Sequence, residues 1–218
     1  EFHTITGQYH GKRITCLSTG IGTDNIDIVM NELDALANID FATRTEKSDH
    51  RTLEIVRIGT CGAMQEDIPL GAFLASQKSI GFDGVLAFYE GRDRLSDLCF
   101  EKALTEFIGY PEKAAVPYIV PANAELIDRV ASTDMYRGCT IAANGFYVPQ
   151  GRVLRCNLAV PDINTKISAF RYEGQRITNY EMEGSAIAGL ALLMGKRVTS
   201  VQSRLPLILL LHWKTGPM

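Results

Sequence analysis

The chain has 218 residues, of which 46% are hydrophobic and 22% charged, and its formal net charge is −3. This composition is close to the average for globular proteins, and the length suits one domain with a sizeable core. Lys and Arg are scattered rather than gathered into the basic stripe that follows a nucleic-acid backbone, so we expect no nucleic-acid partner.

The cysteines, histidines and apolar stretches exclude further classes of protein. Cysteine occurs five times without a CxxC pair, and the four histidines lack the spacing of metal ligands. The first residues do not resemble a signal peptide, and the apolar stretch Leu205–Leu211 is far shorter than the ~20 residues of a membrane helix. We therefore expect a cytoplasmic protein with no membrane partner.

The first predicted elements are a strand, a turn and a helix. Residues 13–18 predict a strand that runs into the turn 19–22. A helix should follow, capped by Thr23 or Asp24. Its expected apolar face recurs at three- and four-residue spacing: Ile26, Val29, Met30, Leu33 and Leu36.

The rest of the chain continues this alternation. Residues 53–58 predict a buried strand that ends in the small-residue turn 59–62. Later patterns predict helices near 97–107, 124–131 and 184–194, and strands at 116–120, 139–143 and 197–201. The repeated units favour an α/β sheet, and no linker or internal repeat divides residues 1–218.

In open α/β sheets, ligands bind beyond the carboxyl ends of strands, which directs attention to residues 18–22, 57–62 and 180–183. The first of these contains Gly20-Ile21-Gly22, whose amides precede a helix and could face an anion. A tight turn with no ligand is the alternative. The dinucleotide-binding fingerprint needs a third glycine after these two, but the residues that follow begin with Thr23 and include none at that place. A nicotinamide enzyme is therefore disfavoured.

Arg57 and Thr60 lie in the second segment, RIGTCG. A guanidinium and a hydroxyl suit an oxyanion such as phosphate, and the glycines leave room for it. The alternative is an ordinary ion pair between Arg57 and a carboxylate at the edge of the core, such as Glu54. Cys61 has no histidine near it in sequence, so a buried structural thiol is favoured over a nucleophile.

The loop Phe146–Arg152 combines an aromatic pair, an amide and an arginine. An aromatic face can stack on a planar heterocycle, and Gln150 offers a donor and an acceptor to its edge. Arg152 could bind a second carbonyl. The alternative is an ordinary loop with buried aromatic residues.

Glu181 and Glu183 directly precede the predicted apolar helix 184–194. Residues two apart point to different faces, so one carboxylate could enter a pocket while the other favours the helix N-terminus. Capping by both is the alternative.

Together these segments resemble, in order and spacing, the uridine phosphorylases of the nucleoside phosphorylase family, over about residues 1–200. The matching segments are EFHT at 1–4, STGIG at 18–22, RIGTCG at 57–62, QGR at 150–152 and NYEME at 179–183. The resemblance implies a single α/β domain whose mixed sheet is flanked by helices.

The resemblance also implies roles for individual residues. Phosphate would be bound by Arg57, Thr60 and Gly22, and ribose by Glu181, Met182 and Glu183. Uracil would be bound by Cys61, Gly62, Phe146, Gln150 and Arg152. The catalytic set would be Arg57, Arg152 and Glu183. A structural potassium ion would be held by Glu1, Ile21 and Asn25.

The activity that the resemblance implies is the reversible phosphorolysis of uridine to uracil and ribose 1-phosphate. Phosphate is then a co-substrate, no cofactor is required, and the chain forms a homo-oligomer, a dimer or a hexamer. The Gln150-x-Arg152 pair favours uridine over a purine nucleoside. The alternatives are a nucleosidase, a purine nucleoside phosphorylase and a non-catalytic nucleoside-binding remnant.

Two departures from the family pattern concern the ends of the sequence. The family carries a further strand, a GDPxR phosphate loop and another arginine ahead of the position of Glu1, and residues 200–218 differ from its usual continuation. We expect the chain as written to be truncated at its N-terminus and to be a weak or inactive phosphorylase.

Overall fold

The structure is a computed structural model that describes residues 2–204. A seven-stranded sheet forms its centre, with the strand order β11-β5-β10-β8-β6-β7 and with β9 paired to β10. Its strands are β5 (Glu54–Ala63), β6 (Phe73–Gly81), β7 (Tyr118–Pro121), β8 (Tyr136–Ala142), β9 (Arg171–Tyr172), β10 (Gln175–Glu181) and β11 (Arg197–Arg204).

The sheet closes on itself. Strand β11 runs parallel to β5 and also pairs antiparallel with β6, so that β11, β5, β10, β8 and β6 form a ring. Strand β8 is parallel to both β6 and β10, whereas β5 is antiparallel to β10. The expected α/β fold with a mixed sheet and flanking helices is therefore confirmed.

Polar side chains fill part of the ring's interior. The Ser76 and Thr140 hydroxyl oxygens are 2.6 Å apart, Gln202 donates to Ser76 at 3.1 Å, and Thr140 donates to Asn179 at 3.0 Å. All four residues are buried. Strands β6 and β10 therefore lack the continuous apolar run that predicts a buried strand, and the sequence did not indicate them.

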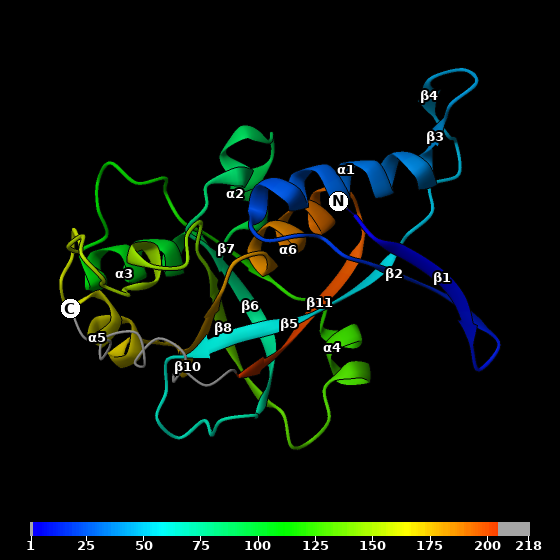
Figure 1. Cartoon of the computed structure of the whole chain (residues 1–218). Coiled ribbons are helices and arrows are strands. Elements are labelled where there is room, and N and C mark those ends of the chain that lie inside the picture. Colours follow the sequence, from blue (N-terminus) through cyan, green and yellow to red (C-terminus); the bar gives the residue numbers. More distant parts are fainter. Residues whose placement is uncertain (1, 205–218) are drawn as a thin grey trace.

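Helices cover two regions of the sheet (Figure 1). Helix α1 (Thr23–Asn38) packs on the largely buried α6 (Gly184–Leu193), and α3 (Leu98–Ile108) packs near α5 (Ile163–Ala169). The shorter helices are α2 (Arg92–Leu95), α4 (Ala124–Val130), η1 (Val85–Phe88) and η2 (Val148–Gln150). Within residues 2–204, no helix is long and apolar enough to cross a bilayer.

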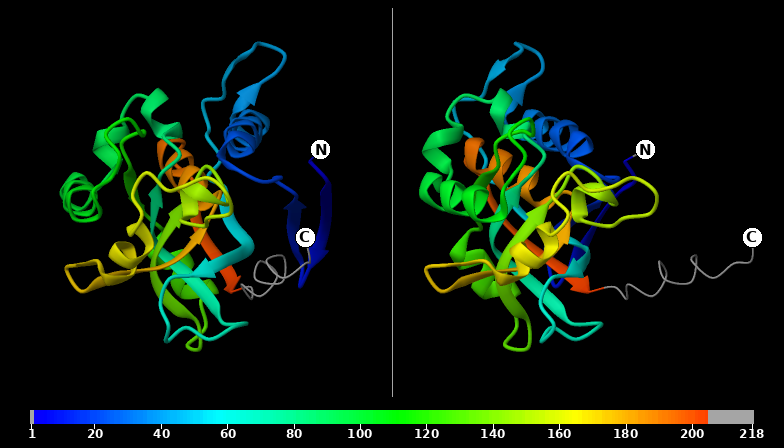
Figure 2. Two further views of the ribbon diagram at one scale, coloured as in Figure 1. Left: turned by 60° about the vertical axis from the view of Figure 1, so that its left-hand side comes forward. Right: turned by 90° about the vertical axis from the view of Figure 1, so that its left-hand side faces the viewer.

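Strand β2 (Lys12–Leu17) pairs with β1 (Thr4–Tyr9) in a separate hairpin that stands away from the central sheet (Figure 2). The turn residues His10 and Gly11 both have positive φ, which suits a two-residue hairpin loop. The expected unit of a sheet strand followed by α1 is therefore wrong, because this strand pairs locally. A smaller hairpin joins β3 (Ile39–Asp40) and β4 (Thr45–Glu46).

Three local expectations also need correction. Residues 59–62 continue β5 instead of forming a turn, because β11 pairs with β5 in unbroken register as far as Cys61. The N-cap of α1 is Gly22, at φ 95°, and no side chain caps the helix. Leu36 is 64% exposed, whereas Ala37 beside it is buried.

A buried lysine joins the α6–β11 turn to α1. Lys196 has a side chain that is 3% exposed, lies 2.6 Å from the Asp34 carboxylate and donates to the Arg51 carbonyl at 3.1 Å. Partial burial raises the pKa of Asp34, but hydrogen bonds from Lys196 and Asn38 outweigh this effect and lower it overall. Asp34 therefore stabilises the fold above its ordinary pKa of 3.8, and this contribution is lost as the pH falls through the lowered pKa.

We predict that Asp34→Asn lowers the free energy of unfolding at neutral pH by about 1–3 kcal/mol, because the Lys196 ammonium loses its charged partner. Urea unfolding measures the change. Asp49→Asn, which removes an exposed carboxylate, is the matched control and should have little effect. An equal loss of unfolding free energy in the Asp34 and Asp49 variants would contradict the prediction.

Candidate active site

Arg57, on β5, lies between two carboxylates. Its Nη2 atom is 2.5 Å from Glu183 Oε2 and 3.1 Å from Glu181 Oε2, and all three side chains are largely buried. Glu181 ends β10 and Glu183 directly precedes α6. Arg57 therefore forms ion pairs, as the alternative had it, but not with Glu54, which pairs with Arg129 and Arg197.

The two carboxylates make different backbone contacts. Glu181 Oε2 accepts hydrogen bonds from the amides of Glu183 and Gly184, at 2.9 and 2.8 Å, and so caps the start of α6. Glu183 Oε1 accepts the Gly22 amide at 2.7 Å. Glu183 therefore connects the turn before α1 to the arginine, and Met182, between the two acids, is partly exposed.

This cluster is buried and carries a net charge of −1 when both acids are ionised. Desolvation raises the pKa of Glu181, and the Arg57 charge opposes that effect. Among the described residues, Arg57 Nη1 and Glu181 Oε1 are buried without a hydrogen-bond partner. A Cβ atom at Gly59 would lie 2.5 Å from Arg57 Nη1, so any larger residue there would displace the guanidinium from its present position.

The expected phosphate ligands are only partly together. Arg57 and Gly22 both contact Glu183. Thr60 is exposed, and side chains three residues apart on a regularly paired strand point to opposite faces. The structure thus separates Thr60 from Arg57, because residues 59–62 extend the strand where a turn was expected.

A cavity of about 320 Å³ adjoins the ends of β5 and β10. It is lined by Gly62, Ala63, Met64, Gln150, Arg152, Asn164, Thr165, Ser168 and Tyr180. Gln150, Arg152 and Gly62, which the sequence indicated for base binding, are thus on one cavity. Tyr180 and the α5 residues were not assigned to it, because α5 carries no recognisable motif.

Arg152 is held in this cavity by its own loop. Its guanidinium carbon lies 4.2 Å from the centre of the Phe146 ring, and its Nη1 donates to the Phe146 carbonyl at 2.6 Å and to Gln150 Oε1. Burial lowers the pKa of Arg152. A Cβ atom at Gly62 would lie 2.7 Å from Arg152 Nη2, so a glycine is needed beneath this side chain.

Two of the expected base-binding residues lie outside the lining of this cavity. Phe146 is 44% exposed and supports Arg152 from one side. Cys61 packs with Ile68 and Leu74. Burial, followed by the nearby Glu181 charge, raises the pKa of the Cys61 thiol to about 12, so the thiol stays protonated and suits a structural role.

The structure describes two of the residues expected to hold potassium, Ile21 and Asn25, and they contact each other. The Ile21 carbonyl accepts a hydrogen bond from Asn25 Nδ2 at 2.7 Å. Glu1 lies outside the described residues. Over residues 2–204, no group of three or more His, Cys, Asp or Glu side chains could hold a metal ion.

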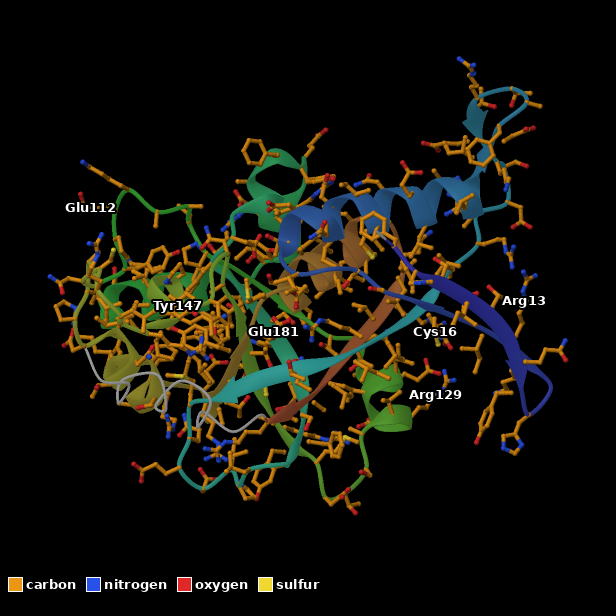
Figure 3. The ribbon with its side chains drawn as sticks, viewed as in Figure 1. Arg13, Cys16, Glu112, Arg129, Tyr147 and Glu181 are labelled. Atoms are coloured by element: carbon orange, nitrogen blue, oxygen red, sulfur yellow. The ribbon has the colours of Figure 1, made fainter. Side chains whose placement is uncertain are left out.

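The two sites are adjacent through their strands. Tyr180 of the cavity precedes Glu181 of the charged cluster on β10, and Tyr180 is paired with Gly62 of β5. Figure 3 shows Glu181 in the interior of the molecule and Tyr147 in the loop that carries Gln150 and Arg152. A polar cavity thus adjoins a buried cluster of one arginine and two carboxylates.

We predict that Glu181→Ala lowers the free energy of unfolding by about 2–4 kcal/mol and Glu183→Ala by about 1–2 kcal/mol. Both carboxylates contact Arg57, but Glu181 accepts two amides at the start of α6, whereas Glu183 accepts one amide, that of Gly22. Urea unfolding of the two variants, each the control for the other, measures the difference. A larger loss of unfolding free energy in Glu183→Ala than in Glu181→Ala would contradict the prediction and make Glu183 the more important residue for stability.

Comparison with known proteins identifies the family. The family model described as the phosphorylase superfamily matches residues 1–203. The uridine phosphorylase of Thermococcus kodakarensis is 26% identical over 209 residues, covering 92% of this chain and 60% of that protein. The uridine phosphorylase of Salmonella typhimurium is 25% identical over 208 residues, covering 92% and 66%. This chain therefore spans less than two thirds of the length of either relative.

The similar proteins also include a purine nucleoside phosphorylase and a solved structure. The DeoD-type purine nucleoside phosphorylase of Alkaliphilus metalliredigens is 43% identical over 66 residues, or 30% of this chain. The crystal structure of a Trypanosoma brucei nucleoside phosphorylase, which is reported to show uridine phosphorylase activity, superposes with a TM-score of 0.79 at 26% identity. The alignment covers 94% of this chain and 74% of that one. The family match over nearly the whole chain, together with this shared fold, shows that the protein belongs to the phosphorylase superfamily.

Proposed function

We propose that this protein acts on uridine as a phosphorylase, converting uridine and phosphate reversibly to uracil and ribose 1-phosphate. The observation that carries the proposal is the cavity holding Gln150 and Arg152 directly beside the Arg57–Glu181–Glu183 cluster. A nucleoside has the matching sequence of groups: a planar base, a sugar with hydroxyl groups, and an anomeric carbon open to attack. The names of the relatives over most of the chain support the same substrate.

The roles proposed for Arg152, Glu183 and Arg57 follow from the charges that the reaction develops on the base and the sugar and that the phosphate carries. A phosphate oxygen forms a bond to the anomeric carbon while the glycosidic bond breaks, and the bonding electrons leave with the base. Arg152 then stabilises the anionic base, since its Nη2 lies over Gly62 at the cavity wall. Glu183 holds the ribose hydroxyls and faces the developing positive charge on the sugar. Arg57, through its unpartnered Nη1, binds phosphate.

A hydrolytic nucleosidase is the second candidate, and a specific observation favours it. Arg57 already pairs with two carboxylates, so the cluster is not positive before phosphate arrives. A dianion placed beside it must displace one of these contacts. Water, which is neutral, attacks without this cost.

We expect loss of uridine, followed by ultraviolet absorbance, to require added phosphate. Phosphate-independent release of uracil would identify a nucleosidase, and turnover of inosine in place of uridine would identify a purine phosphorylase. If uracil binds in calorimetry and neither nucleoside is cleaved, the chain is a non-catalytic binding module.

Within this scheme, Arg152→Leu should lower kcat/KM for uridine by about 10²–10³-fold, because the leaving base loses a donor worth about 2.7–4 kcal/mol. Arg155→Leu is the matched control. Arg155 is exposed and lies three positions further along the chain, and its loss should leave the rate unchanged. If the folded Arg152 variant and the control have equal kcat/KM values for uridine, Arg152 takes no part in the reaction.

A further inference from the structure

One side of strand β5 is apolar and open. Val56, Ile58 and Thr60 alternate along the strand and point to the side opposite to Arg57, which we call the outer face of β5. All three are exposed, Val56 by 40% and Ile58 by 83%. Single exposed apolar residues are ordinary. Two neighbouring β-branched residues on one side of a strand in the central sheet, however, form a surface that normally packs against another layer.

Strand β11, which lies beside β5, is covered on the same side. Val201 is the register partner of Ile58 in this parallel pair, and paired residues point to the same side of a sheet. Val201 is only 7% exposed, because it packs with Val130 and Ala131 at the end of α4 (Figure 1). The cover that α4 gives to β11 therefore stops one strand short of Ile58.

The other edge of β5 brings no cover either. Strand β5 pairs with β11 over residues 54–61, but with β10 only at Gly62 and Ala63. Within residues 2–204, no strand pairs with the second edge of 54–61, and the β1–β2 hairpin stands away from the sheet (Figure 2). Native proteins usually cover an open apolar strand edge with another segment. The described part of the chain does not supply that segment.

The apolar segment Leu205–Leu211 directly follows β11 and lies outside the described residues. Six of its seven residues are leucine or isoleucine, and Pro206 has no N–H to donate to a neighbouring strand. Arg204 is paired with Cys61, so the chain leaves β11 close to the outer face of β5. Ile58 is ~10 Å and Val56 ~17 Å back along β5 from that point, whereas seven extended residues span ~23 Å.

We infer that Leu205–Leu211 folds back over the outer face of β5 and buries Val56 and Ile58. The segment reaches both residues and carries no charged side chain, and burial of two apolar surfaces against each other is favourable in water. Because Arg57 lies between these residues on the opposite side of the strand, the same contact steadies the strand that positions the charged cluster. The inference does not depend on the proposed function.

The first test measures the folding equilibrium constant of the full chain by urea unfolding. Ile58→Ala should lower this constant by about 10–100-fold, because the segment buries the isoleucine side chain. Ile5→Ala is the matched control, since Ile5 is a 71% exposed isoleucine of β1. It should lower the constant by about fivefold or less, the limit set by the strand preference of isoleucine alone. Equal losses in the two variants would overturn the inference.

A double-mutant cycle then assigns the cover to the segment. Leu207→Asp and Leu209→Asp together place two charges in the segment and should keep it in water. In that background, Ile58→Ala should cost about fivefold or less, as at Ile5. An undiminished effect of Ile58→Ala would overturn the inference. An effect that grows with protein concentration would also overturn it, because a second copy would then cover the face.

Fluorescence follows the segment directly, because Trp213 is the only tryptophan of the chain and can be replaced. Ile208→Trp and Leu209→Trp, each combined with Trp213→Phe, place the indole within the segment. At least one of the two should emit at shorter wavelength and resist quenching by acrylamide, compared with the same chain unfolded in urea, and Ile58→Asp should abolish the difference. Two indoles as accessible as in the unfolded chain would overturn the inference.

Discussion

The site depends on one buried arginine that two carboxylates share. Bringing three ionised groups out of water costs several kcal/mol per ion unless each finds partners. Arg57 offers one Nη atom to both acids, and the backbone amides of Gly22, Glu183 and Gly184 satisfy other carboxylate oxygens. Strands β5 and β10, the turn before α1 and the first turn of α6 are held together at this point.

The closed, partly polar ring of strands makes such a site possible. A sheet with a fully apolar core would offer little to orient buried charge. Here Ser76, Thr140, Asn179 and Gln202 form a buried network from four strands, and the charged cluster lies where β10 ends and α6 begins. The cavity of Arg152 uses the ends of the same two strands, β5 and β10, so the geometry of the two subsites is coupled through the sheet.

Much of this could be predicted from the sequence, and the gaps have physical causes. Apolar periodicity indicated α1, α3, α6 and β11, and the Gly22, Arg57 and Glu183 segments were correctly expected to meet. The spacing of apolar residues did not predict β6 and β10, because their inward side chains are partly polar. It also placed the β2 strand in the wrong sheet, because this spacing does not specify which strand a given strand pairs with. Asn164 was not assigned to the cavity, because a short helix without a motif gives no sign in the sequence that tertiary contacts bring it to Gln150.

Glu181 makes three contacts through one atom, because its Oε2 lies beside Arg57 and also accepts two amide hydrogen bonds at the start of α6. Aspartate is too short to span these contacts, and glutamine, whose amide oxygen could accept the same hydrogen bonds, lacks the negative charge that balances Arg57. Because loss of any one of Arg57, Glu181 and Glu183 leaves the others buried without a full set of partners, substitutions at these three positions should be strongly coupled in their effect on stability.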